Sequence, residues 1–383
     1  MRKTVFSILC LEGAVLSFNV AAAPALIPSI SKEFGISQFF TGHIIWLYMV
    51  PYGIAALLYG PLSRRIDPKK IELVCFSFFS LSNLLAAFAR NIYLFFCARF
   101  LMGVFGASVI PLVLILISRY ADPGERGKLV GIFFSATFIA SLLGLSLSAV
   151  IPWRLIFFIP AAFGLLLLIH MWMYLPGFKE TGVQPAVNYR AALKNRKIAL
   201  IFSYIFSVSF LYHGVQQWLA VYFSSALQLN QFLISVLLTL TSFSGIFGEI
   251  AGGWCSDRAG RETTAGFGIS LMVIAVFLLT VGLPLWALAV IMVIWGFGWT
   301  LNHAGLSTML TDLPKDLVHE AAGLNSSVRF ISGGLGVMAG GILMPRGFQR
   351  GFAVFGCGLI VLSFVARRYL MKTKGGYNDQ FKG

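Results

Sequence analysis

The sequence Gly60–Lys70, GPLSRRIDPKK, closes one long apolar run and opens the next, and a related stretch does the same 193 positions later. That second stretch is Gly253–Glu262, GWCSDRAGRE. The residues ahead of both stretches keep the same offset, since Gln38–Phe40 (QFF) leads to the first and Gln231–Leu233 (QFL) leads to the second. A repeat with a period of about half the chain indicates two related bundles of helices.

The composition excludes a soluble globule. Hydrophobic residues make up 58% of the 383 residues, charged residues make up only 11%, and the mean hydropathy is +0.85. A soluble domain carries about 25% charged residues, and a helix needs about 20 apolar residues to cross a membrane. Twelve runs of about that length can be counted, over residues 4–28, 38–62, 71–89, 92–118, 129–151, 155–175, 198–226, 231–255, 264–282, 285–310, 321–345 and 351–370.

The twelve runs and the repeat predict an all-α membrane protein with twelve transmembrane helices in two six-helix bundles, related by pseudo-two-fold symmetry. The N-terminal bundle covers residues 1–175, and the C-terminal bundle covers residues 198–383 with a short basic tail. Residues 176–197 form a predicted cytoplasmic linker. The first run begins like a secretory signal, but Glu12 and Asn19 interrupt it, so we expect it to stay as the first helix.

The net charge of +15 is explained by orientation in a membrane and does not indicate nucleic-acid binding. Most of the 29 lysine and arginine residues fall on the side that holds the N-terminus. The opposite side holds only Lys32, Arg90, Arg154, Arg346 and Arg350. This asymmetry is the positive-inside rule, and it predicts a multi-pass protein of a bacterial inner membrane with both termini cytoplasmic.

Nothing in the sequence suggests an enzyme or a cofactor. The five cysteines are scattered and form no metal spacing or disulfide framework. The sequence contains no phosphate-binding loop of the Gly-x-x-x-x-Gly-Lys-Ser/Thr type and no nucleophile–base arrangement. We therefore expect no metal, no cofactor and an energy source in an ion or solute gradient.

The second loop, Gly253-x-x-Ser256-Asp257-Arg258-x-Gly260-Arg261, resembles the cytoplasmic loop signature of the major facilitator superfamily. The first copy is weaker, because Arg64 stands where the signature has an acid and Asp67 comes three places later. Small residues let the two joined helices approach closely, and cations anchor the loop at the lipid headgroups. The predicted gating-loop residues are Gly60, Arg64, Arg65, Asp67, Gly253, Asp257, Arg258, Gly260 and Arg261.

In the fold that this resemblance implies, the first, fourth, seventh and tenth helices line a central cavity that opens to each side in turn. The seventh span is the most polar one, which a lipid-facing helix would not be. Arg99 in the fourth span is expensive in hydrocarbon unless it is functional or snorkels to the outer interface. The predicted substrate-binding residues are Asn19, Arg99, Tyr212, His213, Gln216, Gln217, Trp295, Trp299, Asn302 and His303.

Three ionisable residues within spans are predicted to couple transport to protons. Glu12 is the leading proton carrier, because removal from water favours the protonated form of a carboxylic acid. Glu249 and Arg329 complete the set, although Glu249 is equally well interpreted as a cap near Arg258 and Arg261.

The leading functional hypothesis is proton-coupled movement of a small organic solute or drug by a monomeric transporter embedded in lipid. Uptake or exchange of an anionic metabolite, bound by Arg99 and Arg329, is a first alternative. The lack of a proline between Pro123 and Pro152 favours this alternative, since drug antiporters of the family usually have a Gly-Pro pair in the fifth helix. A transporter-like receptor or assembly protein that does not cycle is a second alternative, suggested by Arg64.

Overall fold

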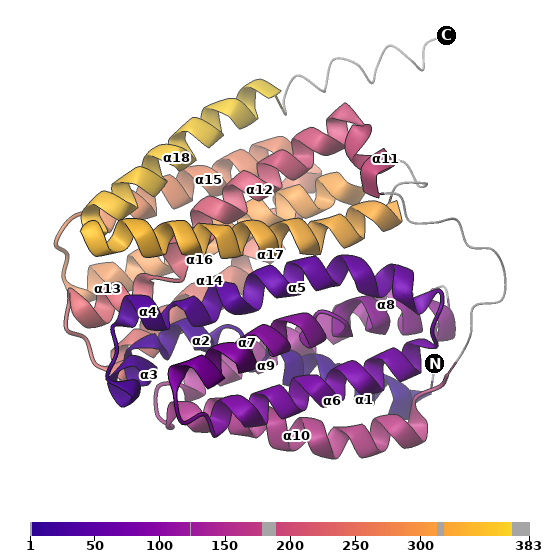
Figure 1. Ribbon diagram of the computed structural model, residues 1–383. Helices are drawn as coiled ribbons and strands as arrows, with labels where there is room; N and C mark the ends of the chain where they lie inside the picture. The colour runs from indigo at the N-terminus through magenta and orange to yellow at the C-terminus, as the bar shows by residue number, and fades with distance from the viewer. Residues whose placement is uncertain (1, 123, 178–188, 312–317, 370–383) are drawn as a thin grey trace, which may run out of the picture. The chain divides into compact units, whose positions relative to one another are not determined.

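The computed structural model describes residues 2–122, 124–177, 189–311 and 318–369, and every regular element in these ranges is helical (Figure 1). The chain divides by its contacts into two compact units. Unit 1 comprises Met1–Val187 and Gln217–Val236, and unit 2 comprises Asn188–Gln216 and Leu237–Gly383. Residues 217–236, which the sequence assigned to the C-terminal bundle, therefore group with unit 1. Most of the predicted linker lies outside the described residues.

Unit 1 contains the helices of the first six spans and the short helix α13. Their bounds are α1 (Lys3–Ser17), α2 (Ala22–Ala25), α3 (Ile27–Phe34), α4 (Gln38–Thr41), α5 (His43–Ser63), α6 (Pro68–Ala87), α7 (Ile92–Gly106), α8 (Val109–Tyr120), α9 (Arg126–Leu147), α10 (Trp153–Tyr174) and α13 (Leu219–Ser225).

Unit 2 contains the remaining helices, and α14 also contributes its first residues to unit 1. Their bounds are α11 (Tyr189–Lys194), α12 (Arg196–Gln216), α14 (Gln231–Arg258), α15 (Arg261–Leu278), α16 (Leu285–Thr311), α17 (Val318–Leu343), the 3-10 helix η2 (Met344–Arg346) and α18 (Phe348–Tyr369).

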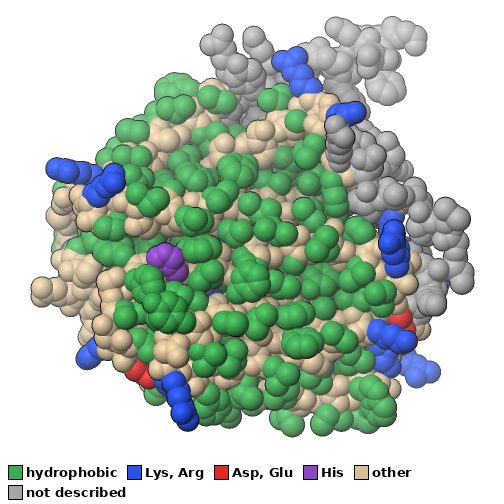
Figure 2. All heavy atoms as spheres, viewed as in Figure 1, with side chains coloured by type: hydrophobic (Ala, Val, Ile, Leu, Met, Phe, Trp, Pro, Cys, Tyr) green, Lys and Arg blue, Asp and Glu red, His purple; other side chains and the backbone are tan. Residues whose placement is uncertain are grey.

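Among the described residues, 12 helical stretches are long and apolar enough to cross a membrane, which confirms the predicted fold class. They are Lys3–Ala25, Gln38–Ser63, Pro68–Ala87, Ile92–Tyr120, Arg126–Leu147, Trp153–Tyr174, Ile198–Ser225, Gln231–Arg258, Arg261–Leu278, Leu285–Leu310, Leu324–Arg346 and Phe348–Val365. On the face in Figure 2, hydrophobic side chains cover much of the surface, and few Lys and Arg side chains lie among them. Such a surface suits contact with lipid.

Four of the described spans are interrupted. The first breaks between α1 and α2, the second between α4 and α5, the fourth between α7 and α8, and the seventh between α12 and α13. A break frees backbone groups from their helical partners, and within a membrane it is tolerated only where protein or a cavity satisfies them. Two predicted site residues, Asn19 and Gln217, lie in these breaks.

The repeated loop of unit 1 is ordered by a helix cap. Asp67 precedes α6, and its Oδ1 accepts a hydrogen bond from the Lys69 amide at 3.0 Å. Pro68 follows at the first helical position, where its missing amide hydrogen costs nothing. The displaced acid of this loop therefore starts the third span.

Gly260 explains why the second loop keeps a glycine ahead of α15. Its φ of 95° and ψ of 151° lie in a region that side chains with a Cβ avoid. Any other residue would strain the turn between α14 and α15. The glycine of the signature is thus a backbone requirement.

Glycine also sets the close packing of α12 against α17 in unit 2. A Cβ added at Gly336 would overlap the backbone carbonyl of Phe210. Nearby, the Ser209 Oγ donates to the Arg329 carbonyl at 2.9 Å, which ties the same two helices together. Gly336 therefore allows a close approach of the two helices, as small residues do between transmembrane helices.

Hydrogen bonds within unit 1 hold residues 217–236. Gln231 Nε2 donates to the carbonyl oxygen of Ala25 at 3.0 Å, and its Oε1 accepts from Ser29 Oγ at 2.6 Å. The hydroxyls of Ser148 and Ser235 lie 2.9 Å apart. The repeat residue Gln231 therefore organises a buried polar contact inside unit 1.

Candidate transport site

Unit 1 contains a buried pair of carboxylic acids. Glu12 of α1 and Glu72 of α6 are both 0% exposed, and their carboxyl groups interact with each other. None of the four carboxyl oxygens accepts a hydrogen bond from an N–H or O–H donor of another described residue. Two carboxyl groups can hydrogen-bond to each other only when one carries a proton. Two acids therefore share one buried site between α1 and α6.

Glu72 is missing from the sequence-based site, because it stands at the start of the predicted span 71–89, beside the cations of the loop. The signal that could have found it is its helical spacing with Cys75, Phe76 and Phe79, which lie on one buried face of α6. A carboxylate on the packed face of a transmembrane helix is a functional candidate by default.

A second buried polar pair links the same two segments. Asn19, in the break after α1, donates through Nδ2 to Asn83 Oδ1 of α6 at 2.5 Å. Asn83 Nδ2 in turn donates to the Phe79 carbonyl at 3.0 Å. Both asparagines are 0% exposed. The structure thus places the predicted binding residue Asn19 in a helix-to-helix contact.

Arg99 is held inside unit 1 and is 1% exposed. Its Nε donates to the Ile44 carbonyl at 3.0 Å, and its Nη1 lies 3.5 Å from Met102 Sδ. The guanidinium also sits over the Tyr48 ring, 4.5 Å from the ring centroid. These contacts join α7 to α5, and they enclose the guanidinium within the protein, whereas a snorkelling arginine would keep exposed surface. Its predicted role in substrate binding stays a prediction.

Unit 2 contains a parallel stack of three aromatic rings. The Tyr212 ring lies 3.8 Å from Trp299 at an interplanar angle of 8°, and 5.1 Å from Trp295 at 16°. Trp295 Nε1 donates to Gln216 Oε1 at 2.7 Å. The structure thus brings together four predicted binding residues from α12 and α16.

Next to this stack lies a charged cluster. His303 Nδ1 is 3.2 Å from Glu249 Oε1, and the two side chains are 34% and 48% exposed. Arg329 of α17 interacts electrostatically with Glu249, His303 and His213. His213 and His303 both border the Trp299 ring, with centroids 5.7 Å and 6.3 Å away. Charge and aromatic surface therefore meet in one place.

Two further predicted residues lie elsewhere. Asn302 is 0% exposed, and its Nδ2 donates to the Ala265 carbonyl at 2.8 Å and to the Tyr204 hydroxyl at 3.2 Å, so it joins α16 to α15 and α12. Gln217 lies in the break between α12 and α13 and groups with unit 1.

The predicted gating residues lie at the ends of the helices that they join. Gly60 is inside α5, and Arg64 and Arg65 follow its end. Gly253, Asp257 and Arg258 lie in the last turns of α14, where the Arg258 guanidinium sits 4.3 Å from the Trp254 ring centroid. Arg261 begins α15 directly after Gly260.

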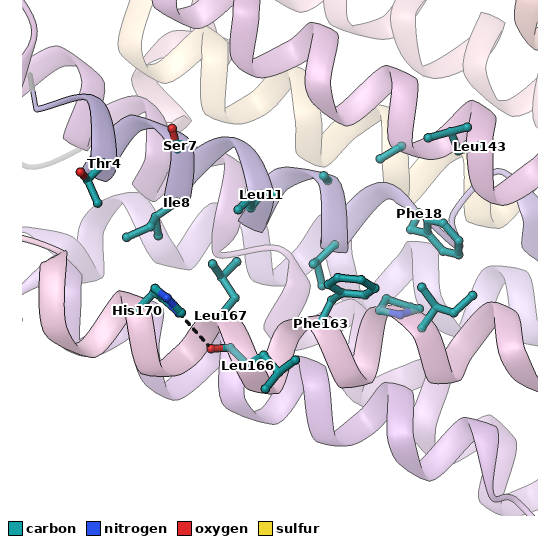
Figure 3. Close-up of a pocket in the computed structure, with 15 residues that line it drawn as sticks. Thr4, Ser7, Ile8, Leu11, Phe18, Leu143, Phe163, Leu166, Leu167 and His170 are labelled. Carbon is teal, nitrogen blue, oxygen red and sulfur yellow. Dashed lines mark hydrogen bonds between the residues drawn. The ribbon is translucent and has the colours of Figure 1, made fainter.

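A large cavity of unit 1 does not coincide with these polar clusters. It has a volume of about 490 Å³ and lies between α1, α9 and α10, where Figure 3 shows Thr4, Ser7 and Ile8 of α1 opposite Leu167 and His170 of α10. Its lining includes Phe163 and Leu166, which are 63% and 62% exposed. The cavity is thus an apolar groove on the outer surface of unit 1, and the chemistry lies in the polar clusters.

The fold and the site define a multi-pass membrane protein of the transporter class. Twelve apolar spans, four of them interrupted, and a polar cluster in each unit are features of that class. The sequence model described as "Major Facilitator Superfamily" matches residues 9–340, and the chain belongs to this family.

Relatives and solved structures agree with this membership. A "Probable sugar efflux transporter" of Helicobacter pylori (strain P12) is 24% identical over 353 residues, covering 90% of this chain and 89% of the relative. A "Gallate transporter" of Pseudomonas putida is 33% identical over 183 residues, covering 46% of this chain and 41% of that protein. The crystal structure of a POT family transporter in complex with 5-aminolevulinic acid has the same fold, with a TM-score of 0.81 at 11% identity over 96% of each chain. The chain is therefore a transporter of small solutes by family.

Proposed function

We propose that this chain is a secondary active transporter that moves a small organic solute across a membrane by alternating access, driven by protons. The single observation that carries the proton coupling is the Glu12–Glu72 pair. When its proton leaves, two neighbouring negative charges remain at a site with no exposed surface, which is strongly unfavourable. Proton release from the pair therefore requires a change in its surroundings, and such a change is what couples a proton to a conformational cycle.

The solute site is assigned to the polar face of α12 and to α16. Tyr212, His213, Gln216, Trp299 and His303 supply aromatic surface together with hydrogen-bonding groups, a combination that suits small organic molecules. Because the names of the relatives include both sugars and gallate, the substrate has to be chosen from this chain's own residues. A second candidate, uptake or exchange of an anionic metabolite, is favoured by the terminal nitrogens of Arg329, which have no hydrogen-bond acceptor among the described residues.

We place both termini on the cytoplasmic side of a bacterial inner membrane and expect a monomer. The orientation is supported by the distribution of Lys and Arg between the two sides of the twelve spans.

The test uses the purified full chain in liposomes that contain a pH-sensitive dye. Pooled organic solutes are added outside, and the internal pH is followed for the native protein, Glu12→Gln and Glu72→Gln. We expect solute-dependent proton flux in the native protein and loss of that flux in both variants. Glu125→Gln is the matched control, because Glu125 is an exposed carboxylate outside the spans, and it should keep the native flux.

Two results would contradict the proposal. Solute uptake that moves no protons and is unchanged in both variants removes the proton coupling. Absence of any solute flux, persisting in Arg64→Asp with its acid restored to the first loop, favours the receptor or assembly alternative.

A further inference from the structure

The guanidinium of Arg329, on α17, has a hydrogen-bond acceptor at only one of its three nitrogens among the described residues. Its Nε donates to Asn325 Oδ1 at 2.8 Å, which sets the orientation of the group. Its Nη1 and Nη2 are buried, and neither has a hydrogen-bond acceptor among the described residues. Buried N–H groups of a cation that have no acceptor are costly, so a group that accepts hydrogen bonds from Nη1 and Nη2 would bind with a gain in free energy.

The neighbours of Arg329 leave these two nitrogens without an acceptor among the described residues. Glu249 is the carboxylate that interacts with Arg329 electrostatically, but its Oε1 is engaged by His303 Nδ1 at 3.2 Å. His213 and His303, which also interact with Arg329, are not anions. The two nitrogens of a guanidinium match the two oxygens of a carboxylate, which they bind through parallel hydrogen bonds.

The aromatic stack ends beside the same group. Tyr212 covers one side of Trp299 at a centroid distance of 3.8 Å, and Trp299 itself remains partly exposed. His213 and His303 connect this ring to the surroundings of Arg329. A flat ring placed in an offset stack with Trp299 would thus continue the existing arrangement of rings.

We propose that unit 2 binds a small planar aromatic carboxylate, with the carboxylate on Nη1 and Nη2 of Arg329 and the ring beside Trp299. This assignment rests on the proposed function, because it names the substrate class of the solute site. In this site, Arg329 recognises the negative charge of the ligand, and Trp299 recognises its flat ring.

The experiment measures binding without any gradient, so its outcome is separate from the test of proton coupling. The full chain in lipid nanodiscs is titrated with three probes while tryptophan fluorescence is followed. Benzoate has the ring and the charge, cyclohexanecarboxylate has only the charge, and benzyl alcohol has only the ring. We expect benzoate to bind at least about 10-fold more tightly than either of the others, since each lacks one of the two contacts.

Variants at Arg329 and Trp299 test the two contacts separately. Arg329→Gln should weaken benzoate binding about 10- to 100-fold and leave benzyl alcohol unchanged, and Arg329→Lys should retain part of the affinity as a point charge. Trp299→Leu should abolish the preference for benzoate over cyclohexanecarboxylate. Each variant is first checked for a monodisperse elution profile and a native-like melting temperature.

Three outcomes would overturn the proposal. They are equal affinity for benzoate and benzyl alcohol, native benzoate affinity in a folded Arg329→Gln protein, and no binding of any probe. If Arg329→Gln does not fold, the proposal is tested by Trp299→Leu alone. A Trp299→Leu protein that still prefers benzoate over cyclohexanecarboxylate would exclude the ring contact. Benzoate binding together with an absence of proton flux would support this proposal while contradicting the proton coupling.

Discussion

The two units share a family fold but differ in the exposure of their polar side chains. In unit 1, the acids Glu12 and Glu72 and the hydrogen-bonded pair Asn19 and Asn83 are all 0% exposed between α1 and α6. In unit 2, the terminal nitrogens of Arg329 have no acceptor among the described residues, and the neighbouring Trp299 and His303 keep exposed surface. A shared scaffold therefore does not fix its chemistry, and each unit has to be interpreted from its own side chains. Our proposal assigns the proton to unit 1 and the solute to unit 2.

The largest predicted effect tests whether the carboxyl pair of unit 1 acts as one group. Glu12→Gln and Glu72→Gln should each reduce solute-dependent proton flux by about 100-fold, and the double variant should reduce it no further, because residues that act as a unit are not additive. The flux is measured in liposomes, as above. If the proton flux of the double variant is reduced by the product of the two single reductions, the two acids work independently. The prediction for unit 1 is then wrong.

The next prediction compares how tightly the helices pack in the two units. A Cβ at Gly144 in unit 1 would overlap the Phe18 carbonyl, as one at Gly336 in unit 2 would overlap that of Phe210. Gly144→Leu and Gly336→Leu should each destabilise the protein by about 3 kcal/mol, at the upper end of overpacking costs. Thermal unfolding in detergent measures this.

Gly131→Leu is the control for both packing variants, because outside the local backbone of α9 no atom of the described residues lies within 4 Å of a Cβ at that position. Its melting temperature should stay close to the native value. A tolerated Gly336→Leu, beside a damaging Gly144→Leu, would show that the seam of unit 2 is looser than that of unit 1.

A smaller effect concerns the buried hydrogen bond between Asn19 and Asn83 in unit 1. Asn83→Leu leaves the Asn19 amide buried without its partner, so we expect a loss of about 1–3 kcal/mol in the free energy of unfolding. Asn19→Leu combined with Asn83→Leu should recover part of this loss, because no unsatisfied amide remains. A double variant less stable than both single variants would argue against a simple mutual hydrogen bond.

The smallest effect concerns the aromatic stack of unit 2. Trp295→Phe removes the hydrogen bond from Nε1 to Gln216 but keeps an aromatic ring beside Tyr212. We expect a loss of about 1 kcal/mol in the free energy of unfolding, the usual net value of one hydrogen bond. Benzoate binding should change less than in Trp299→Leu, and a larger change would move the proposed ring contact to Trp295.

The comparison also explains which parts of the site could be predicted from the sequence. Polar residues concentrated on one span, such as Tyr212, His213 and Gln216, can be recognised because a lipid-facing helix would lack them. The stack of Tyr212 on Trp299 could not be recognised, since the two residues lie on different helices, far apart in the sequence. Glu72 was overlooked because it stands beside loop cations, and its meaning depends on Glu12, which lies 60 positions earlier.

The sequence by itself determined the class of protein, the twelve spans and the duplicated loops, because apolar length and loop chemistry are local properties of the chain. Only the tertiary structure decided which polar side chains meet. It brought Glu12 and Glu72 together and enclosed Arg99 beneath Tyr48. It also left the terminal nitrogens of Arg329 without an acceptor among the described residues, close to Trp299 and His303. The physical reason is that a charged or polar group in a membrane takes its role from its partners, and packing brings those partners from distant helices.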